Sequence, residues 1–243
     1  MTIVNAIIIG AIGSVVGAFL LLALQNFYFG WVSFPGIRKI IRASKEFSKS
    51  GGINFFSSRK SYMKFKDHGS PTDYLMRCEA SIIYVGFWLA HGTNTGNVIE
   101  TLANLLENKK KVTIVLLDPN SQLIYYMSDY LRVDLVEMNN KINYTLTELA
   151  DMYNNLSSSA KEKLTVKLHD TPITASAFLL DNERENSGRT LVDFKLYNRS
   201  RDESFGMEFG KSGNELYDRI TNSYIDIAQK ANLYNISKHK IVS

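Results

Sequence analysis

Two apolar runs decide the fold of this chain: Ser81-Ile-Ile-Tyr-Val-Gly-Phe-Trp-Leu89 and Lys111-Val-Thr-Ile-Val-Leu-Leu117. Both are nearly continuous, which is typical of strands that are buried on both faces. Between them, Val98–Lys109 carries apolar residues at helical spacing and follows the polar loop His91–Asn97. The alternation of strand and helix predicts an α/β fold.

The pattern continues on both sides of this centre. A helix over Pro71–Glu79 and a short strand over Ile53–Phe56 are expected before it. The turn Asp118–Ser121 follows it, and then we expect two helices, four strands and a final helix: Gln122–Leu135, Asn143–Lys163, Leu164–His169, Ala175–Leu180, Thr190–Leu196, Ser204–Phe209 and Asn214–Asn232. This order predicts a mixed α/β sandwich, in which ligands gather at the carboxyl ends of the strands.

The N-terminal segment has the composition of a membrane anchor. Ile3–Leu24 carries no charged side chain, and at about 1.5 Å per residue it is long enough to cross a bilayer. A cleaved signal peptide and a buried helix are the alternatives, but Met1–Asn5 lacks the basic side chain that opens a signal peptide. We therefore predict a retained transmembrane helix within residues 1–34, closed by interfacial rings: Phe27, Tyr28, Phe29 and Trp31.

Positive charge is concentrated just after this segment. Residues 1–67 hold nine basic and two acidic side chains, whereas the remaining residues hold 19 and 22. Because basic residues stay on the cytoplasmic side, we expect the N-terminus outside and the rest inside. Residues 35–52 then form a basic juxtamembrane linker or amphipathic helix on the lipid surface, and residues 53–243 form one cytosolic domain.

Other residue types exclude several classes of site. Cys78 is the only cysteine, which rules out an internal disulfide and fits a reducing compartment. The four histidines lack metal-ligand spacing, so we predict neither a metal nor a cofactor. In the anchor, Gly13-x-x-x-Gly17, together with Gly10, is the close-approach pattern of associating membrane helices and predicts a homo-oligomer. The alternative is that glycine is simply common in such helices.

The part of the chain from residue 53 to residue 232 resembles the phospholipase-D-like superfamily, and its non-catalytic bacterial relatives most closely. Three motifs within this range carry the resemblance. They are the strand Val112-Thr-Ile-Val-Leu-Leu-Asp-Pro119, the polar turn Leu168-His-Asp-Thr-Pro172 and the stretch Thr174-Ala-Ser-Ala-Phe-Leu-Leu-Asp181. The resemblance implies an α/β domain of that family. Catalytic members carry H-x-K-x-x-x-x-D in the third frame, whereas here Thr174 replaces the histidine and Ser176 the lysine, while Asp181 is kept.

These replacements predict a protein that is not an enzyme. A hydroxyl cannot act as a phosphoryl-accepting imidazole, and serine brings no positive charge to a phosphoryl oxygen. His91 and His169 at the strand ends are an alternative catalytic pair, although lone histidines more often have structural roles. What remains is a set of residues able to bind an anion: His91, Thr93, Asn120, His169, Thr174, Ser176, Lys195, Arg199 and Arg201.

Together these features suggest an oligomeric effector that forms a pore in the bilayer or otherwise permeabilises it. The cytosolic domain would bind a nucleotide or short oligonucleotide made by a partner enzyme. By analogy of architecture this resembles the bacterial anti-phage effectors that permeabilise the inner membrane, and the resemblance implies a location in the bacterial inner membrane. Two other hypotheses stay open: a membrane-tethered phosphodiesterase or nuclease with a non-standard site, and a passive membrane adaptor.

Overall fold

The structure is a computed structural model of the 243-residue chain, and it describes residues 42–57, 71–89, 95–184, 187–199, 203–211 and 215–239. The chain divides into two units, Met1–Ser48 and Lys49–Ser243. In the first unit the described residues 42–48 are helical. The predicted transmembrane segment, residues 1–34, lies outside the described ranges. Among the helices within them, none is long and apolar enough to span a membrane.

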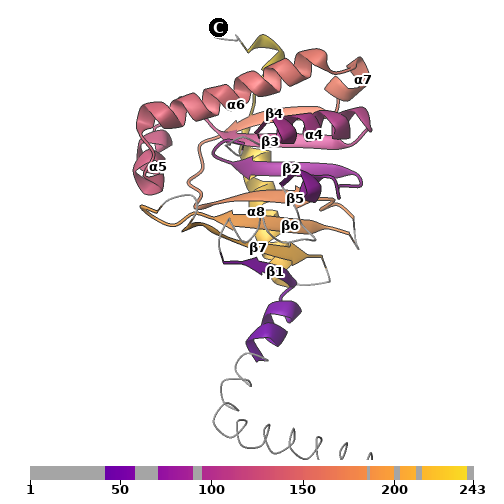
Figure 1. The fold of residues 1–243 in the computed structure, drawn as a ribbon, viewed down its shortest axis with the longest axis vertical. Coiled ribbons are helices and arrows are strands. Elements are labelled where there is room, and N and C mark those ends of the chain that lie inside the picture. Colours follow the sequence, from indigo (N-terminus) through magenta and orange to yellow (C-terminus); the bar gives the residue numbers. More distant parts are fainter. Residues whose placement is uncertain are drawn as a thin grey trace, which may run out of the picture. The chain divides into compact units, whose positions relative to one another are not determined.

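A mixed sheet forms the centre of the second unit (Figure 1). Its described strands are β1 (Gly52–Phe56), β2 (Ser81–Gly86), β3 (Lys111–Leu117), β4 (Leu164–His169), β5 (Ala175–Leu180), β6 (Arg189–Phe194), β7 (Phe205–Gly210) and β8 (Asn232–Leu233). They lie in the order β1-β7-β6-β5-β2-β3-β4-β8. The strands β2, β3 and β4 are parallel neighbours, and the other neighbouring pairs are antiparallel.

The two apolar runs form β2 and β3, in the middle of this sheet, and they are buried strands as predicted. In β3, the side chains from Ile114 to Leu117 are fully buried. The strand β2 is shorter than predicted, because it ends at Gly86 instead of Leu89. Phe87 and Leu89 nevertheless stay buried as the chain leaves the sheet. Burial without strand pairing explains why the sequence alone extended the strand too far.

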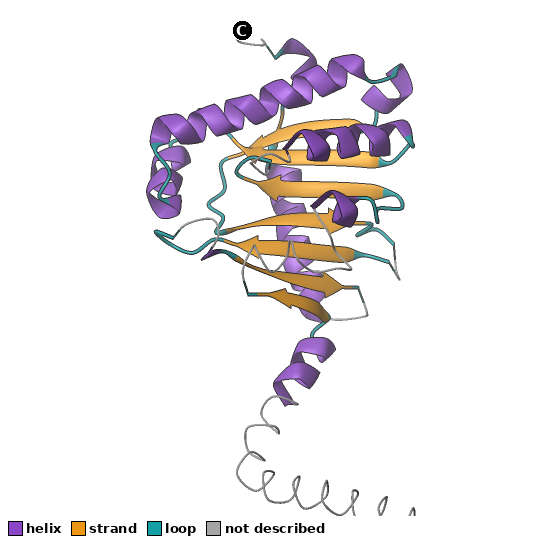
Figure 2. Cartoon of the chain, viewed as in Figure 1, coloured by secondary structure: helices purple, strands orange, loops and turns teal. Residues whose placement is uncertain are grey.

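Helices cover both faces of the sheet (Figure 2). They are α3 (Pro71–Leu75), α4 (Thr95–Glu107), α5 (Leu123–Leu131), α6 (Leu135–Asn155), α7 (Ser158–Lys161) and α8 (Glu215–Lys230), with a 3-10 turn, η2 (Ile236–Lys238). Helix α8 crosses one face, behind the strands in Figure 1, and α4 packs on β3 from the other. A pair of buried hydroxyls, Thr190 and Thr221 at 2.7 Å, joins β6 to α8.

The predicted helix over Asn143–Lys163 was placed too far along the chain. Helix α6 begins at Leu135, because the Asp134 carboxylate accepts from the Val136 N–H at 2.8 Å and the Glu137 N–H at 3.3 Å. The preceding helix α5 ends at Leu131, since the next residue adopts a left-handed conformation. A cap formed by one aspartate therefore decides where the long helix starts.

Other predicted boundaries also differ from the structure. Helix α3 ends at Leu75 and not at Glu79, and α8 ends at Lys230, before Asn232. The two-residue strand β8, which pairs with the end of β4, was not predicted. Such a short exposed strand carries no alternation that a sequence pattern can detect.

Candidate functional site

The candidate site lies at one edge of the sheet, where the carboxyl ends of β2, β3 and β4 meet. Because β5 runs antiparallel to β2, its first residues reach the same edge, together with the end of β6. This edge therefore collects three of the positions chosen from the sequence: His169, Thr174 and Ser176. Lys195 joins them, because its N–H donates to the Thr174 carbonyl oxygen at 2.8 Å.

His169 is the last residue of β4, and its ring is buried, with an exposure of 1%. Its Nδ1 accepts from the Thr171 N–H at 3.3 Å, so Nε2 is left to donate to the Gly86 carbonyl oxygen at 3.2 Å. Burial lowers the pKa of His169 and so favours this neutral form, although these main-chain hydrogen bonds oppose the shift. Both ring nitrogens are hydrogen-bonded to the main chain, so neither is available to react with an incoming substrate.

Ser176 lies beside the end of β2 and is almost completely buried. A Cβ built on Gly86 would lie 2.8 Å from Ser176 Oγ and only 2.3 Å from the Tyr84 hydroxyl. Tyr84 therefore folds over the glycine, and its hydroxyl donates to the Trp88 carbonyl oxygen at 2.6 Å. The tyrosine ring occupies the space next to the serine, so Gly86 is required for close packing.

Charge at this edge comes from an ion pair on β6 and the residue that follows it. Asp193 stands opposite Ser176 in the antiparallel register, and its carboxylate pairs with the Lys195 ammonium. The positive charge of Lys195 is therefore largely balanced by Asp193, whereas the sequence suggested a cation available to a ligand. Arg199 is exposed and lies 3.8 Å from Glu203, a surface pair that contributes about 0.2–1 kcal/mol.

The remaining predicted site residues lie farther out or outside the described ranges. Asn120 is exposed in the turn after β3, where its N–H donates to the Asp118 carboxylate at 2.8 Å. No described contact joins it to the site edge. Outside the described residues lie His91, Thr93, Arg201, Gly10, Gly13 and Gly17.

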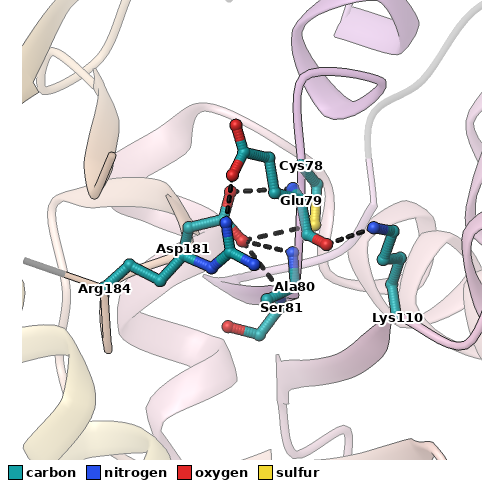
Figure 3. A network of polar contacts seen from close by, with 7 residues as sticks. All are labelled: Cys78, Glu79, Ala80, Ser81, Lys110, Asp181 and Arg184. Atoms are coloured by element: carbon teal, nitrogen blue, oxygen red, sulfur yellow. Dashed lines mark hydrogen bonds and ion pairs between the residues drawn. The ribbon is translucent and has the colours of Figure 1, made fainter. Parts of the chain in front are cut away.

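Asp181, the position kept from the catalytic frame, lies at the opposite edge of the sheet, because β5 separates it from Thr174 and Ser176. Its carboxylate accepts from the N–H groups of the first residue of β2 and the two residues before it (Figure 3). These residues are Glu79, Ala80 and Ser81, at 2.8, 2.6 and 3.0 Å. The aspartate thus ties the end of β5 to the start of β2.

The surroundings of Asp181 are a structural network. Arg184 and Lys110 both contact Glu79. Arg184 pairs with the Glu79 carboxylate, and Lys110 donates to the Glu79 carbonyl oxygen (Figure 3). Cys78 lies within 3.8 Å of the Asp181 carboxylate. Burial, together with that negative charge, raises the pKa of the Cys78 thiol to about 12, so it carries no reactive thiolate at neutral pH.

Sequence reasoning missed three residues at the site edge: Tyr84, Asp193 and Tyr224. Asp193 lies opposite Ser176 and therefore on the same face of the sheet. The alternation of side chains along β6 could have indicated this position from the sequence. Tyr224 comes from α8, and its hydroxyl donates to the Ala175 carbonyl oxygen at 3.3 Å. Its pKa is raised, mainly by burial and then by the charge of Asp193. Nothing in the sequence pattern of α8 indicates this contact.

No group of three or more potential metal ligands occurs among the residues that the structure describes. No protein-family model and no curated protein matches the sequence.

Several solved structures have similar folds. Phosphatidylserine synthase from Haemophilus influenzae has a TM-score of 0.49 and 14% identity, over 70% of this chain and 37% of that one. Nuc, a phospholipase D family member from Salmonella typhimurium, has a TM-score of 0.42 and 9% identity, over 68% and 88%. TrmBL2, an archaeal chromatin protein with a novel mode of DNA binding, has a TM-score of 0.42 and 11% identity, over 87% and 69%.

This chain spans little more than a third of the length of the phosphatidylserine synthase. All three TM-scores lie below 0.5, so the similarities assign no activity, substrate or partner to the chain.

Proposed function

We propose that residues 53–243 form a phospholipase-D-like domain that binds a nucleotide or short oligonucleotide without cleaving it. In this proposal the bound state controls an oligomeric membrane effector, in bacterial anti-phage defence. The single observation that supports binding without cleavage is the pair Thr174 and Ser176 in the frame that carries histidine and lysine in catalytic members.

The chemistry of the described edge agrees with a site that does not hydrolyse its ligand. Cleavage through a covalent intermediate needs an activated nucleophile, and none of the described groups here is one. Ser176 is packed against Tyr84, and the ring nitrogens of His169 are bonded to the main chain. Among the described residues, a substrate phosphate at this edge would meet no imidazole able to attack it.

Binding of an anion depends on the ion pair between Lys195 and Asp193. A phosphate that reaches the Lys195 ammonium must compete with the Asp193 carboxylate, which already neutralises it. Ligand binding therefore exchanges one ion pair for another and releases Asp193 at the end of β6. Such an exchange gives the domain two states that differ in a local contact, which is what a sensor requires.

The membrane part of the proposal rests on the sequence of residues 1–34. A single helix cannot enclose a pore, so permeabilisation requires several chains packed side by side. Binding at the domain would act through the basic residues 35–52, which are adjacent to the anchor in the sequence.

Two assays on purified full-length protein test the proposal. Bound nucleotide is sought by denaturing the protein and analysing the released material by mass spectrometry, with the Lys195→Ala variant for comparison. Phosphodiester hydrolysis is measured in parallel on the same preparation. We expect a nucleotide that is reduced in the variant, and no turnover above background. Turnover that disappears in His169→Ala would support the phosphodiesterase alternative instead, and protein that never binds a nucleotide would support the adaptor.

A further inference from the structure

A cluster of three tyrosine rings, one partly buried and two exposed, lies beside the candidate site. Tyr197, in the turn after β6, is 61% exposed, and its ring centroid lies 5.6 Å from that of Tyr130 on α5. Tyr126, four residues before Tyr130 on the same helix face, is 74% exposed. We call these three residues the tyrosine cluster.

The main chain holds this cluster in place. The Tyr130 hydroxyl donates to the Lys195 carbonyl oxygen at 2.9 Å, and the Asn198 N–H donates to the Tyr130 carbonyl oxygen at 2.8 Å. Asn198 adopts a left-handed conformation, with φ 53°, which asparagine tolerates better than most residues. The turn that carries Tyr197 is thus fixed to α5 from both sides, and the exposed ring is held in advance of binding.

Folding does not explain the exposed ring. A tyrosine that is 61% exposed buries little apolar area, so it adds little to the stability of the domain. The same turn carries Lys195 two residues before Tyr197 and Arg199 two residues after it. A flat aromatic face between two cations suits a ligand that has both a ring and a phosphate.

We infer that the tyrosine cluster is a stacking surface for a nucleobase, and that the ligand is a short single-stranded oligonucleotide. This inference rests on the proposed function and names the class of ligand for that site. A lipid headgroup has a phosphate but no base, so it offers no ring that could stack on the tyrosine cluster. Every base has a stacking face, so the surface accepts different sequences.

The charges around the cluster predict an unusual dependence on salt. Asp129 and Glu203 lie close in sequence to the rings, and Arg199 is paired with Glu203, so both signs of charge are present. Stacking, and not a strongly basic surface, then supplies most of the affinity. We expect a shallow salt dependence, on the order of one or two phosphate contacts.

The test measures binding of a fluorescein-labelled single-stranded hexanucleotide of random sequence to the full-length protein in detergent. A hexamer of abasic sugar-phosphates with the same charge serves as the base-free probe, and ATP as a mononucleotide. The variants are Tyr197→Ala, which removes the ring, and Tyr197→Phe, which keeps it. Tyr144→Ala is the matched control, because Tyr144 is 54% exposed on α6 and outside the cluster.

We expect the hexanucleotide to bind, and the Tyr197→Ala variant to bind it about tenfold more weakly, the effect of losing one stacked base. The Phe and control variants should bind like the wild type, and the abasic hexamer should bind to the wild type at least as weakly as the hexanucleotide binds to Tyr197→Ala. Equal binding of both hexamers, unaffected by Tyr197→Ala, overturns the stacking surface and leaves the proposed anion site standing. If neither hexamer nor ATP binds, the proposed function fails as well.

Discussion

Replacement of Asp181 by alanine should strongly lower the free energy of unfolding of the domain. The buried carboxylate accepts three main-chain hydrogen bonds, and hydrogen bonds to charged groups contribute roughly 1.5–3 kcal/mol each. The bonds are not additive, because burial of the carboxylate offsets part of the gain. Asp181 also has a φ of 52°, a conformation that alanine adopts with strain. We therefore expect a loss of about 3–5 kcal/mol.

Asparagine at the same position should be milder, for a reason that is visible in the geometry. Oδ1 of Asp181 accepts from Ala80 and Ser81, whereas Oδ2 accepts only from Glu79. An amide that keeps its oxygen at the Oδ1 position preserves two bonds and turns its NH₂ toward the Glu79 N–H. Asparagine also tolerates the left-handed backbone. We expect a loss of about 1–3 kcal/mol, set by the one unsatisfied N–H.

The assay is urea unfolding of the full-length protein in detergent, followed by near-ultraviolet circular dichroism. The order of stability should be wild type, Asp181→Asn, then Asp181→Ala, with exposed Glu183→Ala as a neighbouring control close to wild type. An alanine variant as stable as the wild type would refute the structural role. A variant that keeps its stability but loses ligand binding would give Asp181 a functional role instead.

Three further predictions follow from the site edge and the anchor. Gly86→Ala should destabilise the domain by about 1–3 kcal/mol, because its Cβ would meet the Tyr84 hydroxyl at 2.3 Å; the double variant with Tyr84→Leu should lose less than the sum of both in urea unfolding. Asp193→Asn should raise the affinity for ATP or the hexanucleotide about tenfold in fluorescence anisotropy, because it removes the carboxylate charge that pairs with Lys195, and unchanged affinity would contradict competition for that lysine. Gly13→Leu should abolish dye leakage from liposomes while the protein still fractionates with membranes, and undiminished leakage would exclude this face as the interface.

The sequence predicted the centre of the sheet well because burial there is continuous. Strands β2 and β3 are apolar on both faces, and few other structures accommodate such runs. Boundaries were harder, because they depend on single polar contacts. The cap by Asp134 and the left-handed Arg132 set the limits of two helices, and neither alters the hydrophobic period.

The proximity of several candidate residues follows from the sequence, but their electrostatics do not, and their role as a binding site stays a prediction. The carboxyl edge does bring together His169, Thr174, Ser176 and Lys195. The pairing of Lys195 with Asp193 was not foreseen, because it joins residues that were read separately. The packing of Tyr84 over Gly86 depends on a close approach that no residue pattern reveals.

The most direct test of binding without cleavage is the mass of the ligand after binding. Full-length protein is incubated overnight with the single-stranded hexanucleotide and washed, and the bound material is released with denaturant and weighed by mass spectrometry. We predict a single species of unchanged mass, and no nucleotide attached to the protein. Shortened products that disappear in the Ser176→Ala variant, or a covalent adduct on the protein, would contradict the proposal.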